Sequence, residues 1–230
     1  MNFDGTEKII GRGAQADVIE YKGYAYKLYK PSYPAEWIAF EKSQQRAVNT
    51  AGLSDVKYYD TDDPHIVKMD LVKGEVLEQK VRYGFIDGFE ILADAFRKIH
   101  SASTDDIEIP RLSDIAAITL TPEEKTGLLP TIDYLSGKYK ECICHLDMHF
   151  LNIMITDDKY NYTIIDWMNA RIAPPVFDYA RTHVILDEFA KEAVEYYEAA
   201  IAEDKATLGI TDSDYADAIK VCYALRQHEK

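Results

Sequence analysis

The spacing of hydrophobic residues changes along the chain and predicts two regions of different structure. In residues 6–30, short apolar runs alternate with polar residues and are separated by glycines, a pattern typical of a β-sheet with tight turns. Residues 56–59 and 66–69 add two short strands of the same kind. Beyond residue 75, most apolar residues recur at intervals of three and four, which predicts helices. We therefore expect an α+β protein in which a small antiparallel sheet precedes a mainly helical part.

One helix is predicted inside the strand-rich region. Residues 35–51 place apolar side chains at roughly helical intervals, and Gly52 closes the segment. This pattern puts Trp37 on the buried face of the helix, together with Phe40 and Val48.

The two regions are interpreted as lobes, the first over residues 1–69 and the second over residues 75–230, joined by a hinge at residues 70–74. In the second lobe, an apolar stripe runs from Phe85 to Ser101 and predicts a helix. Further helices are predicted at residues 112–119, from Pro122 onward behind the capping residue Thr121, at 179–206 and at 212–228.

Residues 144–167 contain the densest group of candidate catalytic residues. Two apolar runs of β type flank a polar turn at residues 156–161, which predicts a hairpin. Asn152 comes just before the first run, Asp166 ends the second, and Asp147 lies five residues before Asn152. The hairpin is expected to gather these side chains at one end. Phosphoryl transfer needs such a set, because one carboxylate orients the attacking hydroxyl and two oxygen ligands hold Mg²⁺.

The same segment has two other interpretations. His145, Asp147 and His149 alternate along the chain, and imidazole with carboxylate is a ligand set that suits zinc or manganese in a metallohydrolase. In a purely structural interpretation, Asp147 and Asn152 cap a helix and Asp166 ends a strand.

A candidate phosphate-binding element lies near the start of the chain. Gly11 and Gly13 fall between two predicted strands, where a backbone can approach a phosphate without interference from side chains. Lys27 follows in an alternating strand and shares a face with Ala25. A lone lysine on a strand is usually solvated, but the glycines ahead of Lys27 favour a role in phosphate binding.

The helix predicted at residues 35–51 is expected to carry a glutamate that pairs with Lys27 and fixes its ammonium group. Glu41 is the predicted partner and Glu36 the alternative; both could instead be solvent-exposed helix formers. In the hinge, main-chain groups of Asp70 and Val72 could hydrogen-bond the edge of an adenine. The alternative there is an ordinary connection between a strand and a helix.

Composition narrows the class of partner. The chain carries 40 acidic and 26 basic residues, a formal net charge of −14, which disfavours nucleic acid and anionic membranes because both bind clustered Lys and Arg. Residues 187–230 hold eleven acids and five Lys or Arg, a net of −6, which weakly favours a cationic ligand.

Residues 1–5 lack the features of a signal peptide, and no run approaches the roughly 18 apolar residues of a membrane span. A cytoplasmic protein is expected.

The cysteines point to the same compartment. Cys142, Cys144 and Cys222 are odd in number and do not form a disulfide framework, so we interpret them as reduced core residues. Cys142 and Cys144 with His145 resemble a metal-binding cluster only faintly, because they occupy an alternating strand.

The order of these motifs resembles that of the aminoglycoside phosphotransferase and choline kinase family, small-molecule kinases with a protein-kinase-like fold. The spacing His-x-Asp-x4-Asn, with an Asp fourteen positions later, is similar to the kinase catalytic loop and metal-binding Asp. His149 and the pair Asp166-Trp167 are more similar to this family than to protein kinases. The resemblance covers about residues 5–185.

The resemblance implies a bilobal kinase-like fold that transfers the γ-phosphate of ATP, with Mg²⁺, to a hydroxyl of a small aminoglycoside-, choline- or sugar-like molecule. It implies that Asp147 is the catalytic base and that Asn152 and Asp166 hold Mg²⁺. Lys27, paired with Glu41, would bind the ATP phosphates. The alternative function is a non-catalytic nucleotide-binding regulator, which would be expected to have lost a catalytic group.

Val18 follows Gly11 at the sequence spacing at which kinases place the residue that covers the adenine. Three positions depart from the family pattern. Ala16 replaces the third glycine of the phosphate loop, Leu146 replaces the glycine between His and Asp, and residues 150–151 replace a Pro-Gly pair before the Asn. These changes affect loop geometry and the choice of acceptor, and they remove no functional group.

Overall fold

The fold is known from a computed structural model, which describes residues 3–84, 87–157 and 160–229. Phe85, the first residue of the predicted helical stripe, lies outside the described residues. Residues 1–2, at the start of the chain, and residues 158–159, in the predicted hairpin turn, also lie outside the described residues.

Contacts between residues divide the chain into two compact units, which are described separately below. Unit 1 comprises Met1–Gly74 and Met154–Met168, and unit 2 comprises Glu75–Ile153 and Asn169–Lys230. The lobe boundaries predicted from the sequence stay a prediction.

Unit 1 is built on a five-stranded antiparallel sheet, as the sequence predicts, with the strand order β1-β2-β3-β5-β4. The strands are β1 (Lys8–Arg12), β2 (Ala16–Tyr21), β3 (Tyr24–Tyr29), β4 (Tyr58–Tyr59) and β5 (Ile66–Asp70). Lys22 and Gly23 connect β2 to β3, and both have positive φ angles, 48° and 81°. Such a two-residue turn matches the twist of the strands it joins.

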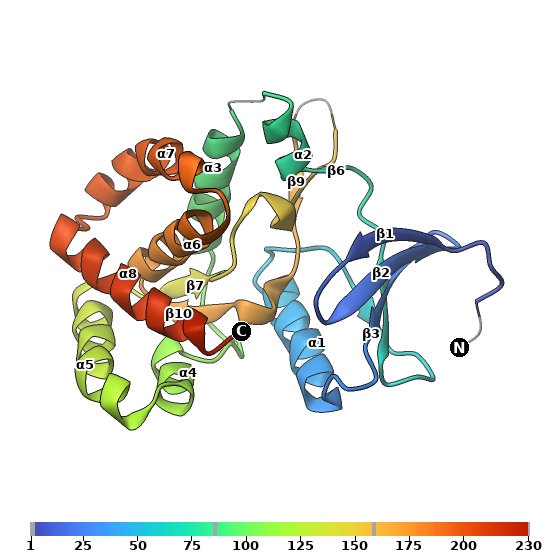
Figure 1. Cartoon of the computed structure of the whole chain (residues 1–230), viewed down its shortest axis with the longest axis horizontal. Helices are drawn as coiled ribbons and strands as arrows, with labels where there is room; N and C mark the ends of the chain where they lie inside the picture. Colours follow the sequence, from blue (N-terminus) through green and yellow to red (C-terminus); the bar gives the residue numbers. More distant parts are fainter. Residues whose placement is uncertain (1–2, 85–86, 158–159, 230) are drawn as a thin grey trace. The chain divides into compact units, whose positions relative to one another are not determined.

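Helix α1 (Ala35–Thr50) packs against one face of this sheet, as Figure 1 shows. Ile38 of the helix joins the buried cluster of Ala16, Tyr29 and Val67. The opposite face carries a second cluster formed by Ile19, Tyr21 and Tyr26, against which the ring of Phe3 packs edge-on.

The predicted apolar face of α1 is wrong at Trp37, which is 48% exposed. The buried side chains of this helix include those of Glu41, Gln44 and Gln45. Polar residues occupy this face because the neighbouring strand and loop offer them partners: Glu41 accepts a hydrogen bond from Tyr29, and Gln45 donates to the Ser54 hydroxyl. Hydrophobic spacing could not reveal this face, since its partners come from elsewhere in the chain.

The predicted hairpin after the catalytic segment is confirmed. Strands β8 (Ile153–Ile155) and β9 (Tyr162–Ile164) are neighbours in a second, small sheet. The N–H of Thr156 donates to the carbonyl of Asn161 over 2.8 Å across the turn. A 3₁₀ turn at Trp167–Asn169 follows directly after Asp166.

Unit 2 is mainly helical, as predicted. Its helices are α2 (Leu77–Arg82), α3 (Gly88–His100), α4 (Leu112–Thr119), α5 (Pro122–Lys138), α6 (Pro175–Phe189), α7 (Val194–Thr207) and α8 (Asp212–Gln227), with 3₁₀ turns at Phe150–Asn152 and Lys191–Ala193. Its strands are β6 (Glu75–Val76), β7 (Cys142–Cys144) and β10 (Arg171–Ala173), of which β7 and β10 pair antiparallel. Helix α6 contacts both α7 and α8 (Figure 1).

The single helix predicted at residues 179–206 is wrong, because two helices, α6 and α7, occupy this stretch. The break falls at Ala190, whose φ of −154° and ψ of 57° are not helical. Neither glycine nor proline marks this break, so the sequence gives no sign of it. The first of the two helices also begins earlier than predicted, at Pro175, a residue suited to the first helical position because it has no N–H to leave unpaired.

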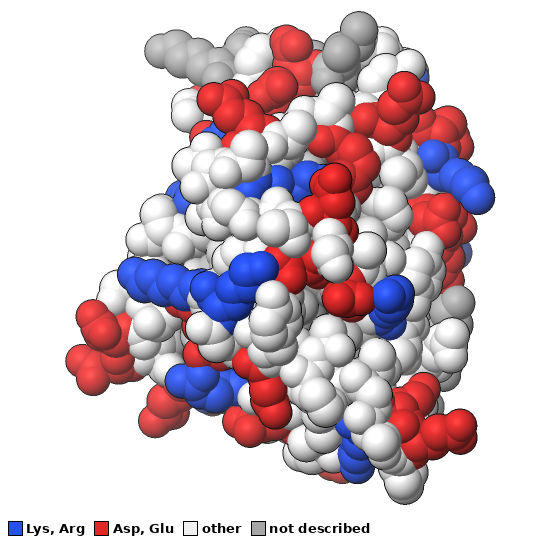
Figure 2. Space-filling model, turned by 90° about the vertical axis from the view of Figure 1, so that its left-hand side faces the viewer, with Lys and Arg blue, Asp and Glu red and all other residues white. Residues whose placement is uncertain are grey.

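Acidic and basic side chains are interspersed on the face of the molecule that Figure 2 shows. Among the described residues, no helix combines the length and apolar character needed to cross a lipid bilayer.

Candidate functional site

In unit 1, strand β3 and helix α1 bring together the predicted ion pair. The Lys27 Nζ lies 2.7 Å from the Glu41 Oε1. The second oxygen of Glu41 accepts a hydrogen bond from the hydroxyl of Tyr29 over 2.6 Å, so both carboxylate oxygens have partners. Glu36 is exposed, and Glu41 is therefore the partner of Lys27, as predicted.

The surroundings of Lys27 keep its ammonium group charged. Burial alone would lower the pKa of Lys27, but the carboxylates of Asp166 and Glu41 outweigh it and raise the pKa above its usual value. Burial and the nearby Glu41 carboxylate also raise the pKa of Tyr29, so its hydroxyl remains a donor to Glu41. A permanently charged and fixed ammonium group is suited to binding an anion.

Asp166 is the third charged member of this group in unit 1. Its Oδ1 lies 3.9 Å from the Lys27 Nζ, and 43% of its side chain is exposed. Asp166 has a φ of 62°, the left-handed conformation that Asp and Asn tolerate better than most residues. This backbone turns the chain sharply between β9 and the following 3₁₀ turn.

The glycines lie where β1 turns into β2. Gly11 pairs with Val18 across the two strands, with an irregularity in the ladder between Ile9 and Gly11. The N–H of Gly13 donates to the carbonyl of Ala16 over 2.9 Å, and a Cβ on Gly13 would lie 3.1 Å from that oxygen. A side chain at residue 13 would therefore crowd the turn, which is otherwise exposed to solvent.

In the predicted hinge, Asp70 is the last residue of β5. Its N–H donates to the carbonyl of Lys57 over 3.0 Å, and its carboxylate accepts hydrogen bonds from the N–H of Lys57 and the hydroxyl of Tyr59. The Asp70 N–H and side chain are thus used within the sheet.

In unit 2, the loop after β7 brings Asp147 and Asn152 together. The side-chain NH₂ of Asn152 donates to the Asp147 carbonyl over 2.8 Å and lies 3.4 Å from the carboxylate Oδ2. The Nε2 of His149 lies 3.8 Å from the same Asp147 oxygen. Asn152 is buried, whereas about a fifth of the Asp147 side chain, 21%, is exposed. The loop therefore presents one partly solvated carboxylate beside a buried amide.

Asp178, at the start of α6, fixes this loop. Its two fully buried carboxylate oxygens accept hydrogen bonds from the N–H groups of His145 and Leu146 over 3.0 and 2.8 Å. Leu146 has a φ of 54°, a conformation that costs energy for a branched residue and that these bonds help to hold. The Nε2 of His100 donates a third hydrogen bond to the Asp178 Oδ2 over 3.0 Å. Sequence reasoning missed His100, since no local motif links it to a residue so far along the chain.

The metallohydrolase interpretation is not supported by the loop geometry. In the described part of the chain, His145, Asp147 and His149 do not bring three ligand atoms together. His145 is fully buried, whereas Asp147 and His149 are both partly exposed, so the alternation along the chain does not produce a shared centre.

Comparison with protein families decides the class of this protein. The sequence model of the phosphotransferase enzyme family, APH, matches residues 8–209. The chain belongs to this family. As a member of the phosphotransferase family it is an enzyme, and the family predicted from the sequence is confirmed. A comparison with curated protein sequences finds no match.

Solved structures with the same fold include members of both predicted branches. Aminoglycoside phosphotransferase APH(3'')-Id from Streptomyces rimosus ATCC10970 has a TM-score of 0.64 at 17% identity, covering 96% of this chain and 93% of that one. A choline/ethanolamine kinase family protein from Mesorhizobium loti has a TM-score of 0.55 at 14% identity, covering 97% and 89%. Choline kinase LicA from Streptococcus pneumoniae has a TM-score of 0.58 at 14% identity, covering 96% and 83%. The predicted kinase-like α+β fold is confirmed.

Proposed function

We propose that this phosphotransferase uses ATP and Mg²⁺ to phosphorylate a hydroxyl group of a small molecule. The observation that carries the proposal is the fixed ammonium group of Lys27, held between the carboxylates of Glu41 and Asp166 in a member of the phosphotransferase family. An ammonium group of this kind stabilises the negative charge of a phosphoryl group during transfer.

Asp147 is the proposed catalytic base. The acceptor hydroxyl oxygen attacks the γ-phosphorus, the bond from that phosphorus to the bridging oxygen of ADP breaks, and the hydroxyl proton passes to the Asp147 carboxylate. Asp147 suits this role because its carboxylate is partly exposed and its position is fixed through Asn152 and the Asp178 anchor. A positioned base of this kind typically accelerates transfer by about 10²–10⁴.

The residues proposed to hold Mg²⁺ fit this ion by their chemistry. Both described hydrogen bonds from the Asn152 amide to Asp147 use its NH₂, which leaves its carbonyl oxygen as the ligand atom. The Asp166 carboxylate is 43% exposed and offers the kind of oxygen ligand that Mg²⁺ prefers. When bound, the ion would neutralise charge on the phosphate oxygens. Zinc would be disfavoured by this all-oxygen set.

The remaining predicted contacts would position the nucleotide. The backbone around Gly11 and Gly13 is proposed to cover the phosphates, and Val18, opposite Gly11, to cover the adenine. At the hinge, the Asp70 carbonyl and the Val72 main chain are proposed to bond the adenine edge; the Asp70 N–H already donates to Lys57. The solved relative from Streptomyces rimosus is in complex with ADP and streptomycin, which supports a nucleotide as the donor here.

The proposed acceptor is a small, cationic molecule that carries a hydroxyl group. Residues 187–230 have a net charge of −6, and the similar structures include aminoglycoside phosphotransferases and a choline kinase. A thermal-shift screen of aminoglycosides, choline-like amines and neutral sugars, with a non-hydrolysable ATP analogue present, tests this class, because a ligand that binds the folded state raises its midpoint of unfolding. A shift with neutral sugars alone would contradict the cationic acceptor.

Slow ATP hydrolysis tests the catalytic assignment before an acceptor is known. The wild-type chain is expected to release phosphate from ATP only with Mg²⁺, and Asp166→Asn is expected to lose this activity while keeping the left-handed backbone that Asn tolerates. Asp62→Asn is the matched control, because Asp62 is an exposed aspartate of the same unit. Nucleotide binding with no hydrolysis in the wild type would favour the alternative, a non-catalytic regulator.

A further inference from the structure

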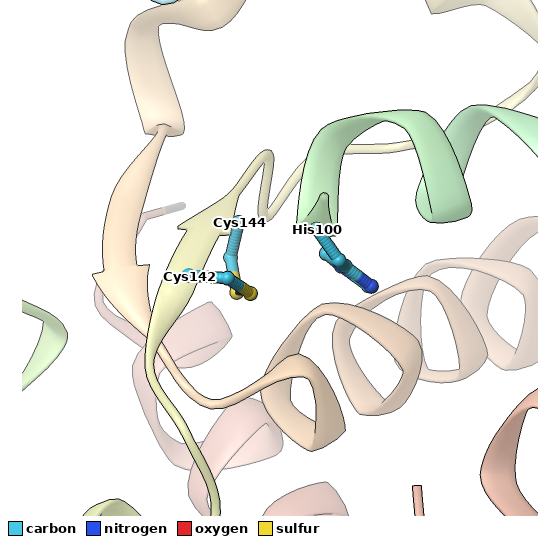
Figure 3. Close-up of side chains that lie close together, drawn as sticks. All are labelled: His100, Cys142 and Cys144. Atoms are coloured by element: carbon cyan, nitrogen blue, oxygen red, sulfur yellow. Dashed lines mark hydrogen bonds between the residues drawn. The ribbon is translucent and has the colours of Figure 1, made fainter. Parts of the chain in front are cut away.

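A second cluster of ligand-type side chains lies in unit 2, apart from the residues assigned above to nucleotide and acceptor. Cys142 and Cys144 lie on strand β7, and His100 is the last residue of helix α3. One ring nitrogen of His100 and the two sulfur atoms all lie within 4.8 Å of one another. Figure 3 shows both sulfurs on the same side of β7, toward the end of the helix from which His100 extends. Alternate residues of a strand share a face, so the Cys-x-Cys spacing produces this arrangement.

The histidine is already oriented as metal-binding histidines are. Its Nε2 lies 3.0 Å from the Asp178 Oδ2, a position in which the neutral form of the ring would donate Nε2–H to the carboxylate and keep a lone pair on Nδ1. Nδ1 is buried and has no hydrogen-bond partner among the described residues, and 9% of the side chain is exposed. A carboxylate that fixes the far nitrogen of a ligating histidine is a common second layer of zinc sites.

The two sulfurs have the separation that a shared ion requires. Cys142 Sγ lies 3.8 Å from Cys144 Sγ. Two thiolates bound at about 2.3 Å to one tetrahedral Zn²⁺ would also lie about 3.8 Å apart. Because the three atoms lie within 4.8 Å of one another, some point lies no more than about 2.8 Å from all of them. Zinc bonds are about 2.0–2.3 Å long, so shifts of about half an ångström would close the site.

We propose that His100, Cys142 and Cys144 bind a structural Zn²⁺ ion. Binding releases two protons from the thiols, and two thiolates with Zn²⁺ and a neutral imidazole leave no net charge in a buried position, which avoids the cost of burying an unpaired ion. The carbonyl oxygen of Ala173 lies 3.5 and 3.3 Å from the two sulfurs and is a candidate fourth ligand. The ion would link the end of α3, through His100, to β7, through the two cysteines.

The wild-type chain itself provides the first test. Reduced protein, freed of metal with a chelator, is titrated with Co²⁺, which substitutes for zinc and gives sulfur-to-cobalt charge-transfer absorption when thiolates ligate it. We expect saturation at one Co²⁺ per chain, release of two protons, and loss of the absorption when Zn²⁺ displaces Co²⁺. No charge-transfer absorption would overturn the proposal, whatever any variant does.

Variants then assign the ligands. Cys142→Ser and Cys144→Ser are each expected to lose at least half of the absorption, and Zn²⁺ should raise their midpoint of unfolding less than it raises that of the wild type. Cys222→Ser is the matched control, because Cys222 is equally buried on α8 but lies outside the cluster. Circular dichroism without metal checks that each variant is folded. Equal absorption in all three variants, or loss confined to Cys222→Ser, would contradict the assignment.

Discussion

The carboxylate of Glu41 is shared between two donors: its Oε1 lies 2.7 Å from the Lys27 Nζ and its Oε2 2.6 Å from the Tyr29 hydroxyl. Lys27 is thereby fixed on a strand while its ammonium group still lies 3.9 Å from Asp166. The pair thus holds a charged group in place, with 16% of the Lys27 side chain exposed.

Replacing Lys27 by Met is expected to lower the rate of phosphoryl transfer by about 10²–10³, because a fixed charge on the phosphates is lost. Steady-state kinetics should show a lower kcat together with a higher KM for ATP. Lys68→Met is the control: Lys68 lies on the neighbouring strand β5, with its Nζ 3.5 Å from the centre of the Tyr24 ring. Equal losses in both variants would show that a general change of the sheet, rather than the Lys27 charge, is responsible.

Asp147→Asn is expected to reduce turnover by about 10²–10⁴, because the amide cannot accept the hydroxyl proton. Binding of a non-hydrolysable ATP analogue should be nearly unchanged, and calorimetry can measure it alongside the kinetics. Asp133→Asn, an exposed change on α5, provides the matched control. Turnover at the wild-type level in Asp147→Asn would exclude Asp147 as the base.

Asp178→Asn is expected to destabilise the fold, since one of the oxygens that accept from His145 and Leu146 becomes an NH₂ group. A buried N–H left without an acceptor costs about 1–3 kcal/mol, and the free energy of unfolding in urea should fall by about this amount. Because the same bonds fix the loop that carries Asp147, kcat should fall as well. A stable variant with an unchanged kcat would show that the loop holds its shape without this anchor.

Glu198 of α7 is expected to make the stability of the chain sensitive to acid. Burial would raise the pKa of Glu198, but hydrogen bonds from His183, Lys205 and Tyr215 outweigh it and lower the pKa to about 2. A lowered pKa in the folded state stabilises the protein above the ordinary pKa of 4.5, and this contribution disappears as the pH falls from 4.5 to about 2.

Glu198→Gln should therefore be less stable than the wild type at neutral pH, and its free energy of unfolding should change less across that interval. Urea denaturation at steps of pH measures both slopes. Parallel curves for the two proteins would mean that other carboxylates account for the acid sensitivity.

The sequence predicts the parts of the site that follow from local spacing. Asp147, Asn152 and the hairpin before Asp166 lie within one short segment, so strand alternation and turn composition are enough to identify them. Glu41 is also the predicted partner of Lys27, with Glu36 as the alternative, and the ion pair confirms Glu41.

Features that depend on distant partners could not be predicted in this way. His100 meets Asp178 and the two cysteines through packing of α3 against β7, and no motif near His100 indicates this contact. Trp37 shows the opposite error: a large apolar residue at helical spacing is exposed, because polar residues with partners in a strand and a loop take the buried face.

The composition of unit 1 limits how the chain can be shortened or recombined. A fragment ending at Gly74 would contain all five strands and α1 but not Met154–Met168, and so would lack Asp166. The ammonium group of Lys27 would then keep Glu41 as its carboxylate partner and lose the other. Chimaeras that exchange only the first 74 residues between relatives would combine a lysine from one parent with an aspartate from the other. A transplant of the complete unit must therefore include Met154–Met168 as well as the first 74 residues.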